Sequence, residues 1–231
     1  MEAQYTGVEI LEALEHAENY NGYLVRLIRD SADAKTAVDF GAGVGTFARR
    51  LREEGFSVIC IEADLSQRER LTRDGFEAFA DVESLPQDSA PFIFSMNVFE
   101  HIRDDKKALQ QLHEKLQPGG VLLVYVPAFQ CLWSSLDDKV CHYRRYTKDT
   151  LERLVRGEGL IVERVEYVDS LGFIVAFAFR LLRLNAEALT PSAISIYDRW
   201  IFPPSRVLDI IFRRFFGKNL FIVCRKAATD G

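Results

Sequence analysis

Cysteine is scarce in this sequence and shows no spacing typical of a disulfide framework or a metal site. The 231 residues include four cysteines and four histidines. None forms a C-x-x-C or H-x-x-H pair, and two of the cysteines lie within apolar runs. We therefore expect a reduced protein that uses cysteine for packing, and we predict no metal site. The cysteines are Cys60, Cys131, Cys141 and Cys224.

Long apolar runs are also missing. The longest, residues 171–179, ends at Arg180 and falls well short of the about 20 residues that span a bilayer. Residues 1–11 lack the charged start and apolar centre of a signal peptide. We predict a cytoplasmic protein without a transmembrane segment, while peripheral contact with a membrane stays open.

Positive charge is not in excess. The 29 Lys and Arg residues face 34 Asp and Glu residues, and the net charge is −5. A general basic field for nucleic acid is therefore absent, and we expect no nucleic-acid partner. Glycine, proline and low-complexity tracts are too few for a fibrous or disordered chain. The length predicts a single domain over residues 1–231.

Strand-like and helix-like segments alternate along the chain, which predicts an α/β fold with a mostly parallel sheet between helices. An N-terminal helical arm covers residues 1–30, with a break expected near Asn21 and Gly22. Residues 170–218 form a helical insertion before the last strand. The other expected helices are 46–54, 66–74, 104–116 and 148–156. The expected strands are 36–40, 57–62, 76–80, 91–96, 121–126, 160–168 and 219–225.

Alternate glycines at Gly41, Gly43 and Gly45 follow the first predicted strand directly. Glycine lets the backbone turn sharply and approach a ligand, and the next helix offers free N–H groups at its start. A dinucleotide-binding turn would have a glycine where this chain has Thr46. The pattern that Asp39 opens therefore indicates a nucleoside ligand without a pyrophosphate. A tight turn without a ligand is the alternative.

This turn and several later segments resemble the class I S-adenosylmethionine-dependent methyltransferases, over about residues 17–169. The resemblance implies a doubly wound, seven-stranded, Rossmann-like fold, with S-adenosylmethionine as cofactor and S-adenosylhomocysteine as product. It implies that the glycine loop passes beneath the cofactor and that Asp39 helps to orient it. Glu62, at the end of the second strand, matches the acidic residue that binds both ribose hydroxyls, and its two oxygens suit a vicinal diol. A surface glutamate is the alternative.

Further segments extend the resemblance. By position, Asp81 accepts from the adenine amino group and the N–H of Val82 meets the adenine ring, although Asp81 also reads as a helix N-cap. A bacterial subgroup of the family is more similar still, and from it we assign Tyr20 and Asn97 to the cofactor site. The segments shared with that subgroup are 19–21, 97–102 and 142–147.

Two histidines follow strands at the edge where an open α/β sheet binds its ligands. His101 is the first candidate for a general base, because imidazole titrates near neutral pH. His142 is the second. For His101 the alternative is a histidine that caps or packs the following helix. Arg144 and Arg145 could bind an anionic acceptor between Tyr143 and Tyr146, unless this segment is a solvated basic turn. We predict that these four flanking residues bind substrate.

Aromatic and arginine residues are concentrated in the insertion at 170–218. We favour a lid that covers the acceptor, with Tyr197 and Trp200 as substrate contacts, because methyl transfer needs a dry site. A dimer interface and a patch on a membrane surface are the alternatives, so the chain is expected to be a monomer or a homodimer.

The sequence thus predicts methyl transfer from S-adenosylmethionine to an oxygen or nitrogen of a small-molecule acceptor in a biosynthetic pathway. A lipid-linked or sugar acceptor at a membrane face is the main alternative. A non-catalytic S-adenosylmethionine-binding protein and a nicotinamide oxidoreductase are more distant alternatives.

Overall fold

One seven-stranded sheet forms the centre of the protein, in the order β3-β2-β1-β4-β5-β7-β6. The computed structural model describes residues 17–182 and 191–228. The pairs between β3 and β5 are parallel, and β7 runs antiparallel to both β5 and β6. This confirms the predicted fold class. The strands are β1 (Thr36–Phe40), β2 (Ser57–Ile61), β3 (Glu77–Phe79), β4 (Ala90–Met96), β5 (Leu116–Pro127), β6 (Ile161–Val168) and β7 (Asn219–Arg225).

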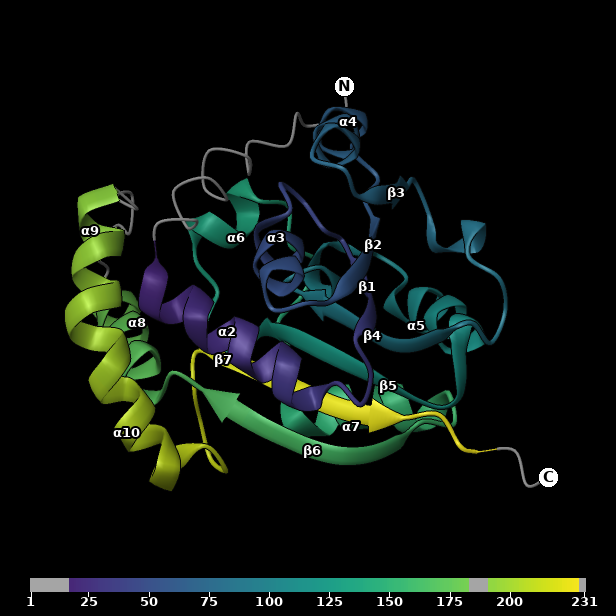
Figure 1. Ribbon diagram of the computed structural model, residues 1–231. Helices are drawn as coiled ribbons and strands as arrows, with labels where there is room; N and C mark the ends of the chain where they lie inside the picture. The colour runs from purple at the N-terminus through teal and green to yellow at the C-terminus, as the bar shows by residue number, and fades with distance from the viewer. Residues whose placement is uncertain (1–16, 183–190, 229–231) are drawn as a thin grey trace.

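Helices cover both faces of this sheet (Figure 1). Alternate residues of each strand point to opposite faces, so the sheet contributes to two hydrophobic cores. The first core is closed by α2 (Glu18–Ser31), α3 (Thr46–Glu53) and α4 (Leu65–Arg73). The second is closed by α5 (Asp105–Lys115) and α7 (Lys148–Gly157). These layers leave the carboxyl ends of β1, β2, β4 and β5 together at one edge. The short elements are η1 (Val82–Ser84), η2 (Phe99–His101), η3 (Gln130–Leu132) and α6 (Ser135–Lys139).

The expected break in the N-terminal arm is wrong within the described part of the chain. Helix α2 continues through Asn21 and Gly22. A glycine inside a helix costs about 1 kcal/mol relative to alanine, and burial of the apolar face of α2 offsets that cost. Residues 1–16 of the arm lie outside the described residues. The buried residues of this face are Leu24, Val25, Leu27 and Ile28.

Strand β5 begins earlier than the sequence predicted. Pro118, Gly119 and Gly120 lie within the strand, not in a turn that precedes it. Leu116 already pairs with Ala90, and the register then shifts before the regular pairing begins. The glycines therefore form an irregularity in a paired strand. Most other expected boundaries differ from the observed ones by one or two residues.

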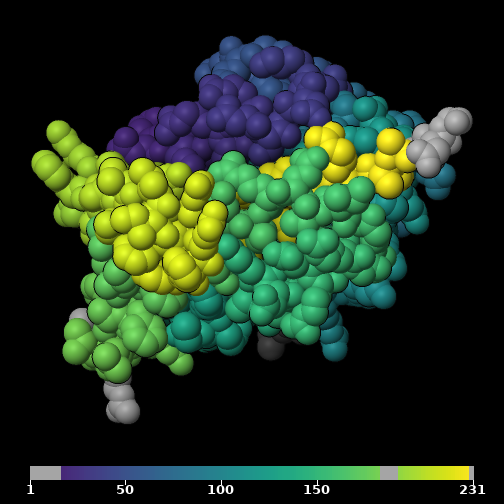
Figure 2. Space-filling model, turned by 90° about the horizontal axis from the view of Figure 1, so that it is seen from below, coloured from purple at the N-terminus to yellow at the C-terminus, as the bar shows by residue number. Residues whose placement is uncertain are grey.

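The insertion between β6 and β7 is helical, as predicted, and packs at one end of the sheet (Figure 1). Figure 2 shows its last helix against α2 on the outside of the molecule. Buried carboxylates hold it there: Asp198 accepts from the backbone N–H of Tyr20 at 2.8 Å, and Asp209 accepts from that of Asp169, which follows β6, at 2.9 Å. The insertion contains α8 (Ser170–Leu181), α9 (Pro191–Ile196), the π-helical turn η4 (Tyr197–Ile201) and α10 (Phe202–Phe212).

None of the helices in the described ranges is long and apolar enough to cross a membrane.

Candidate functional site

The glycine turn joins β1 to α3 at the carboxyl edge of the sheet. Gly41, Gly43 and Gly45 have φ values of 81°, 54° and 84°, a left-handed region that favours glycine. The N–H of Gly41 donates to the carbonyl of Ile61 at 2.8 Å, which ties the turn to β2. A Cβ at Gly41 would collide with the side chain of Val98, which follows β4. The turn therefore packs directly against the loop that carries the candidate histidine His101.

Glu62 lies at the end of β2 and supports this turn. One carboxylate oxygen accepts from the N–H of Gly43 at 2.7 Å, and the other accepts from the N–H of Asp64 at 2.8 Å. A carboxylate oxygen can accept more than one hydrogen bond, so both retain capacity for a hydroxyl. Asp64 itself caps α4, accepting from the N–H of Gln67 at 3.0 Å.

Asp39 is buried beside this pair, with 1% of its surface exposed. Its Oδ2 atom has no hydrogen-bond partner among the described residues. Burial, together with the nearby charge of Glu62, raises the pKa of Asp39 well above its usual value. A buried carboxyl group without a partner is costly, and a cationic ligand group would relieve that cost. The surroundings of Asp39 are therefore compatible with the contact to the cofactor that the sequence predicted, and that contact stays a prediction.

Asp81 and Val82 follow β3. The Asp81 side chain accepts from the N–H of Ser84 at 3.2 Å and so caps η1, as the helix-cap alternative predicted. Asp81 is exposed and Val82 is buried. A capping carboxylate keeps a free lone pair, so the cap and the expected adenine contact are compatible.

Tyr20 on α2 and Asn97 in the loop after β4 contact each other through their side chains. The Tyr20 hydroxyl donates to the hydroxyl of Tyr125 on β5 at 3.1 Å, and its ring packs edge-on against Phe202 of the insertion. Burial raises the pKa of Tyr20, while hydrogen bonds with Tyr125 and Asn97 act against that rise. Asn97 has a φ of 55° and is exposed. The structure thus joins α2, β4, β5 and the insertion near the predicted cofactor residues.

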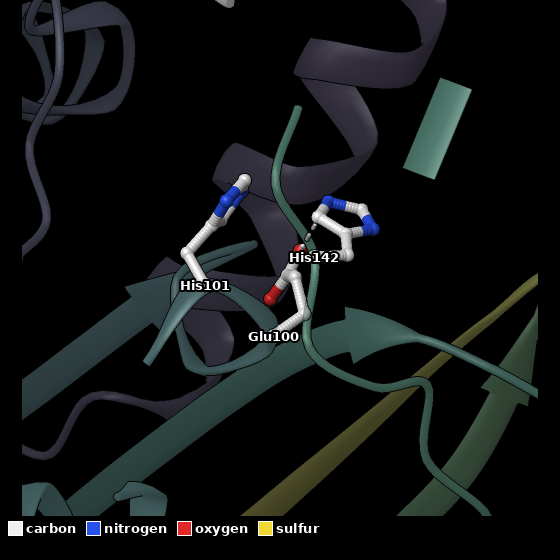
Figure 3. A group of neighbouring side chains, drawn as sticks. All are labelled: Glu100, His101 and His142. Atoms are coloured by element: carbon white, nitrogen blue, oxygen red, sulfur yellow. Dashed lines mark ion pairs between the residues drawn. The ribbon is translucent and has the colours of Figure 1, made fainter. Parts of the chain in front are cut away.

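Glu100, His101 and His142 form a cluster beyond the ends of β4 and β5 (Figure 3). Their ligand-capable atoms all lie within 4.8 Å of one another, and the two imidazole rings are 4.6 Å apart between centroids. Burial, with the neighbouring His142, lowers the pKa of His101 to about 4. Burial raises the pKa of Glu100 to about 8. The structure therefore brings both candidate histidines together and adds a buried carboxyl group between them.

Asp137 orients the ring of His142 through its Nδ1 atom. Its Oδ1 atom lies 2.8 Å from Nδ1 of His142, and its two oxygens accept from the guanidinium of Arg145 at 2.7 and 2.9 Å. Burial acts against ionisation of Asp137, but the hydrogen bonds from His142 and Arg145 hold its pKa below the usual value. Neither Glu100 nor Asp137 was predicted as a site residue from the sequence. The short separation of Asp137 from His142 in the sequence was the one feature that could have indicated their contact.

The other predicted substrate residues lie in the segment that follows His142. Arg144 pairs with Asp105, and the buried Tyr146 donates to the same carboxylate at 2.8 Å. Arg144, Arg145 and Tyr146 line a surface hollow of about 480 Å³ between α5 and α7. Tyr143 is 56% exposed and is free to contact a bound molecule.

Tyr197 and Trp200 occupy different environments on η4. The Tyr197 hydroxyl donates a short hydrogen bond to Asp169, and burial raises the pKa of Tyr197 far above its usual range. Trp200 is 67% exposed, with the guanidinium of Arg199 5.6 Å from its ring. Tyr197 therefore anchors the insertion, whereas Trp200 faces outward.

Comparisons with known proteins agree with this geometry. Residues 8–165 match the methyltransferase domain family. A protein of Oceanobacillus iheyensis described as an uncharacterized methyltransferase is 31% identical over 116 residues, which are 46% of this chain and 52% of that protein. Phosphoethanolamine N-methyltransferase 2 of Caenorhabditis elegans is 27% identical over 130 residues, which are 51% of this chain and 29% of that protein. This chain thus matches about half of the first relative and less of the second.

A solved S-adenosylmethionine-dependent methyltransferase of Archaeoglobus fulgidus shares the fold. It superposes with a TM-score of 0.63 at 16% identity, covering 91% of this chain and 94% of the other. The family match spans more than half of the sequence and includes the glycine turn, Glu62, Asp81 and the loop after β4. The fold is that of the solved S-adenosylmethionine-dependent methyltransferase, and the chain therefore belongs to the methyltransferase domain family.

Proposed function

We propose that the protein transfers the methyl group of S-adenosylmethionine to an oxygen or nitrogen of a small-molecule acceptor in a biosynthetic pathway. One observation carries the proposal: the turn held by Glu62 and the cluster of Glu100, His101 and His142 share one edge of the sheet. Val98 links the turn to the cluster. Its side chain packs on Gly41, and it precedes Glu100 by two residues in the sequence. A cofactor on the turn would present its methyl group near polar groups that suit an acceptor.

S-adenosylmethionine supplies a methyl carbon made electrophilic by the sulfonium. The protein positions the two reactants and keeps water out of the site. Asp39 and Glu62 bind and orient the cofactor. The buried contacts of Tyr20 with Tyr125 and Phe202 exclude water. The exposed ring of Tyr143 gives the acceptor a flat contact.

The acceptor loses its proton at the cluster. Of the two histidines, His142 is the better placed to accept it, because Asp137 fixes the ring through Nδ1 and leaves Nε2 for the proton. His101, with a pKa of about 4, provides a weaker base at neutral pH. This ranking reverses the order that the sequence suggested.

Calorimetry with S-adenosylmethionine and with NADH tests the cofactor first. Transfer of a labelled methyl group to a panel of hydroxy and amino compounds then tests the acceptor class. Once an acceptor is known, His142→Ala should lower kcat by about 100-fold or more, the range that general bases contribute. The matched control is His113→Ala on α5, which should retain turnover. Equal turnover in both variants, or binding of NADH in place of S-adenosylmethionine, would refute the proposal.

A small acceptor in a reducing compartment fits two further observations. The four cysteines are all unpaired, which supports the cytoplasm as the location. The similarity to a phosphoethanolamine N-methyltransferase supports a small molecule over a macromolecule.

A membrane-bound acceptor is the second candidate, and the insertion favours it. Apolar side chains on its outer surface are 64–73% exposed, namely Leu181, Leu182, Trp200, Val207, Ile210, Ile211 and Phe215. Within residues 170–182 and 192–218, every ionisable side chain that is not buried is Arg, Lys or Tyr, while Asp198 and Asp209 are buried. Apolar side chains beside cations suit an anionic lipid surface.

Sedimentation with vesicles tests this candidate. The protein should bind anionic vesicles more tightly than neutral ones, and Ile210→Glu should weaken binding. Ser192→Glu, on the exposed side of α9, serves as the charge-matched control. Equal binding by both variants, or no binding by the wild-type protein, would leave the soluble acceptor as the function.

A further inference from the structure

The buried carboxyl group of Glu100 has no role that protein contacts alone explain. Glu100 is 1% exposed, and its Oε2 atom has no hydrogen-bond partner in the part of the chain that is described. Its Oε1 atom lies 4.0 Å from Nε2 of His142, longer than a hydrogen bond. A buried acid with an unpaired oxygen is costly unless a cation or a donor joins it.

The two imidazoles beside it are arranged as metal ligands usually are. Ligating histidines commonly use their second ring nitrogen to bond a carboxylate or a backbone carbonyl. His142 does so through Nδ1, which lies 2.8 Å from Asp137. His101 has a hydrogen bond with the backbone of Val140. Two histidines and one carboxylate are a frequent ligand set for zinc and other divalent transition metals.

The three ligand atoms would have to move only a short distance toward one another to bind one ion. The three ligand atoms lie within 4.8 Å of one another, whereas bonds of about 2.1 Å in a tetrahedral site hold ligands about 3.4 Å apart. Side-chain movements of about 1 Å would close that difference. Arg145, whose charge acts on Glu100, is already paired with Asp137, which reduces its repulsion of an ion.

We propose that Glu100, His101 and His142 bind one divalent transition-metal ion, with Asp137 as the residue that positions His142. His142 retains 13% side-chain exposure, so an open coordination position on that side is accessible to an acceptor. In the metal-loaded protein, Nε2 of His142 binds the ion and no longer accepts the proton directly.

The ion narrows the acceptor class, and this step rests on the proposed methyl transfer. A hydroxyl bound at the open position has a lowered pKa and releases its proton to water. The oxygen keeps lone pairs for attack: its bond to the methyl carbon forms as the carbon–sulfur bond breaks, and the electron pair of that bond goes to sulfur. A bound amine would spend its single lone pair on the metal. The site therefore favours a hydroxyl acceptor.

Metal binding can be measured without cofactor or acceptor. We would strip the protein with a chelator and titrate it with Zn²⁺ by calorimetry and with Co²⁺ by visible absorption. Wild-type protein should bind one ion per chain. Glu100→Gln and His101→Gln should weaken binding by about 100-fold or more, and Asp137→Asn by about 10- to 100-fold, as for residues behind metal ligands.

Two controls address the other potential ligands. His113→Gln and Cys141→Ser should bind the ions as the wild-type protein does. Calorimetry with S-adenosylhomocysteine checks each variant for a folded cofactor site and shows whether the proposed function fails separately. Absence of ion binding by the wild-type protein would overturn the metal site. So would unchanged affinity in folded Glu100→Gln and His101→Gln proteins.

Discussion

Replacement of Glu62 by glutamine tests the cofactor site at the level of single hydrogen bonds. The carboxylate accepts from the N–H of Gly43 at 2.7 Å and from that of Asp64 at 2.8 Å. Glutamine keeps the size of the side chain but has only one acceptor oxygen. Its amide nitrogen must then face one of the two N–H donors, and one ribose hydroxyl loses its acceptor.

The expected loss follows from these unmade bonds. Leaving a buried donor without an acceptor costs about 1–3 kcal/mol. Glu62 is only partly buried, and water can replace part of the loss, so we expect the total to stay within that range. The dissociation constant for S-adenosylhomocysteine should therefore rise by about 5- to 150-fold in Glu62→Gln.

Titration calorimetry on the wild-type protein, Glu62→Gln and the matched control Glu69→Gln gives the result. Glu69 is exposed on α4, so its variant should bind as the wild-type protein does. A 2′-deoxy analogue completes the cycle, because it should lose more affinity with the wild-type protein than with Glu62→Gln. Equal losses in the two proteins would show that Glu62 supports the turn and does not bind the ribose.

Three further predictions test neighbouring parts of the site. Gly43→Val places a branched residue at a φ of 54° and should abolish cofactor binding in a protein that circular dichroism shows to be folded; retained affinity would contradict the assignment. The raised pKa of Asp39 means that binding a cationic ligand group releases a proton, so affinity should rise with pH above the usual titration range of an aspartate, and Asp39→Asn should lose that dependence. Tyr197→Phe should lower the free energy of unfolding by about 1–3 kcal/mol, since Asp169 loses a donor, whereas Trp200→Ala should change it by less than about 0.5 kcal/mol. Calorimetry and urea denaturation measure these effects, and equal destabilisation by the last two variants would contradict the separate roles of the residues.

Local patterns were sufficient for most of the fold and for the cofactor turn. Short apolar runs predicted the strands at the centre of the sheet because β1, β4, β5 and β7 are buried between the helical layers. The glycine turn could be identified because its φ values depend on residues next to one another in the sequence. The break expected at Gly22 was wrong because that signal is also local, whereas the burial that keeps α2 intact comes from the sheet.

The acceptor side of the site depends on pairs that sequence patterns do not show. Glu100 and His142 are 42 residues apart, yet the N–H of Tyr143 donates to the carbonyl of Glu100 at 2.7 Å and holds the two segments together. No periodicity or motif in the sequence predicts that contact. The burial that raises the pKa of Glu100 to about 8 likewise follows only from the packed structure.

The basic segment that includes Arg144 and Arg145 shows how such contacts change the expected charge of the acceptor. From the sequence, two guanidinium groups predict recognition of an anion. In the structure Arg145 forms a two-pronged pair with Asp137, and Arg144 pairs with Asp105. Removing Arg145 would leave the carboxylate of Asp137 buried beside His142 without its cation, which is more costly than losing a surface charge. Both arginines are therefore already paired with carboxylates of the fold, of which Asp137 is buried, and an acceptor need not be an anion to fit beside them. That conclusion agrees with a neutral hydroxyl acceptor at Glu100, His101 and His142.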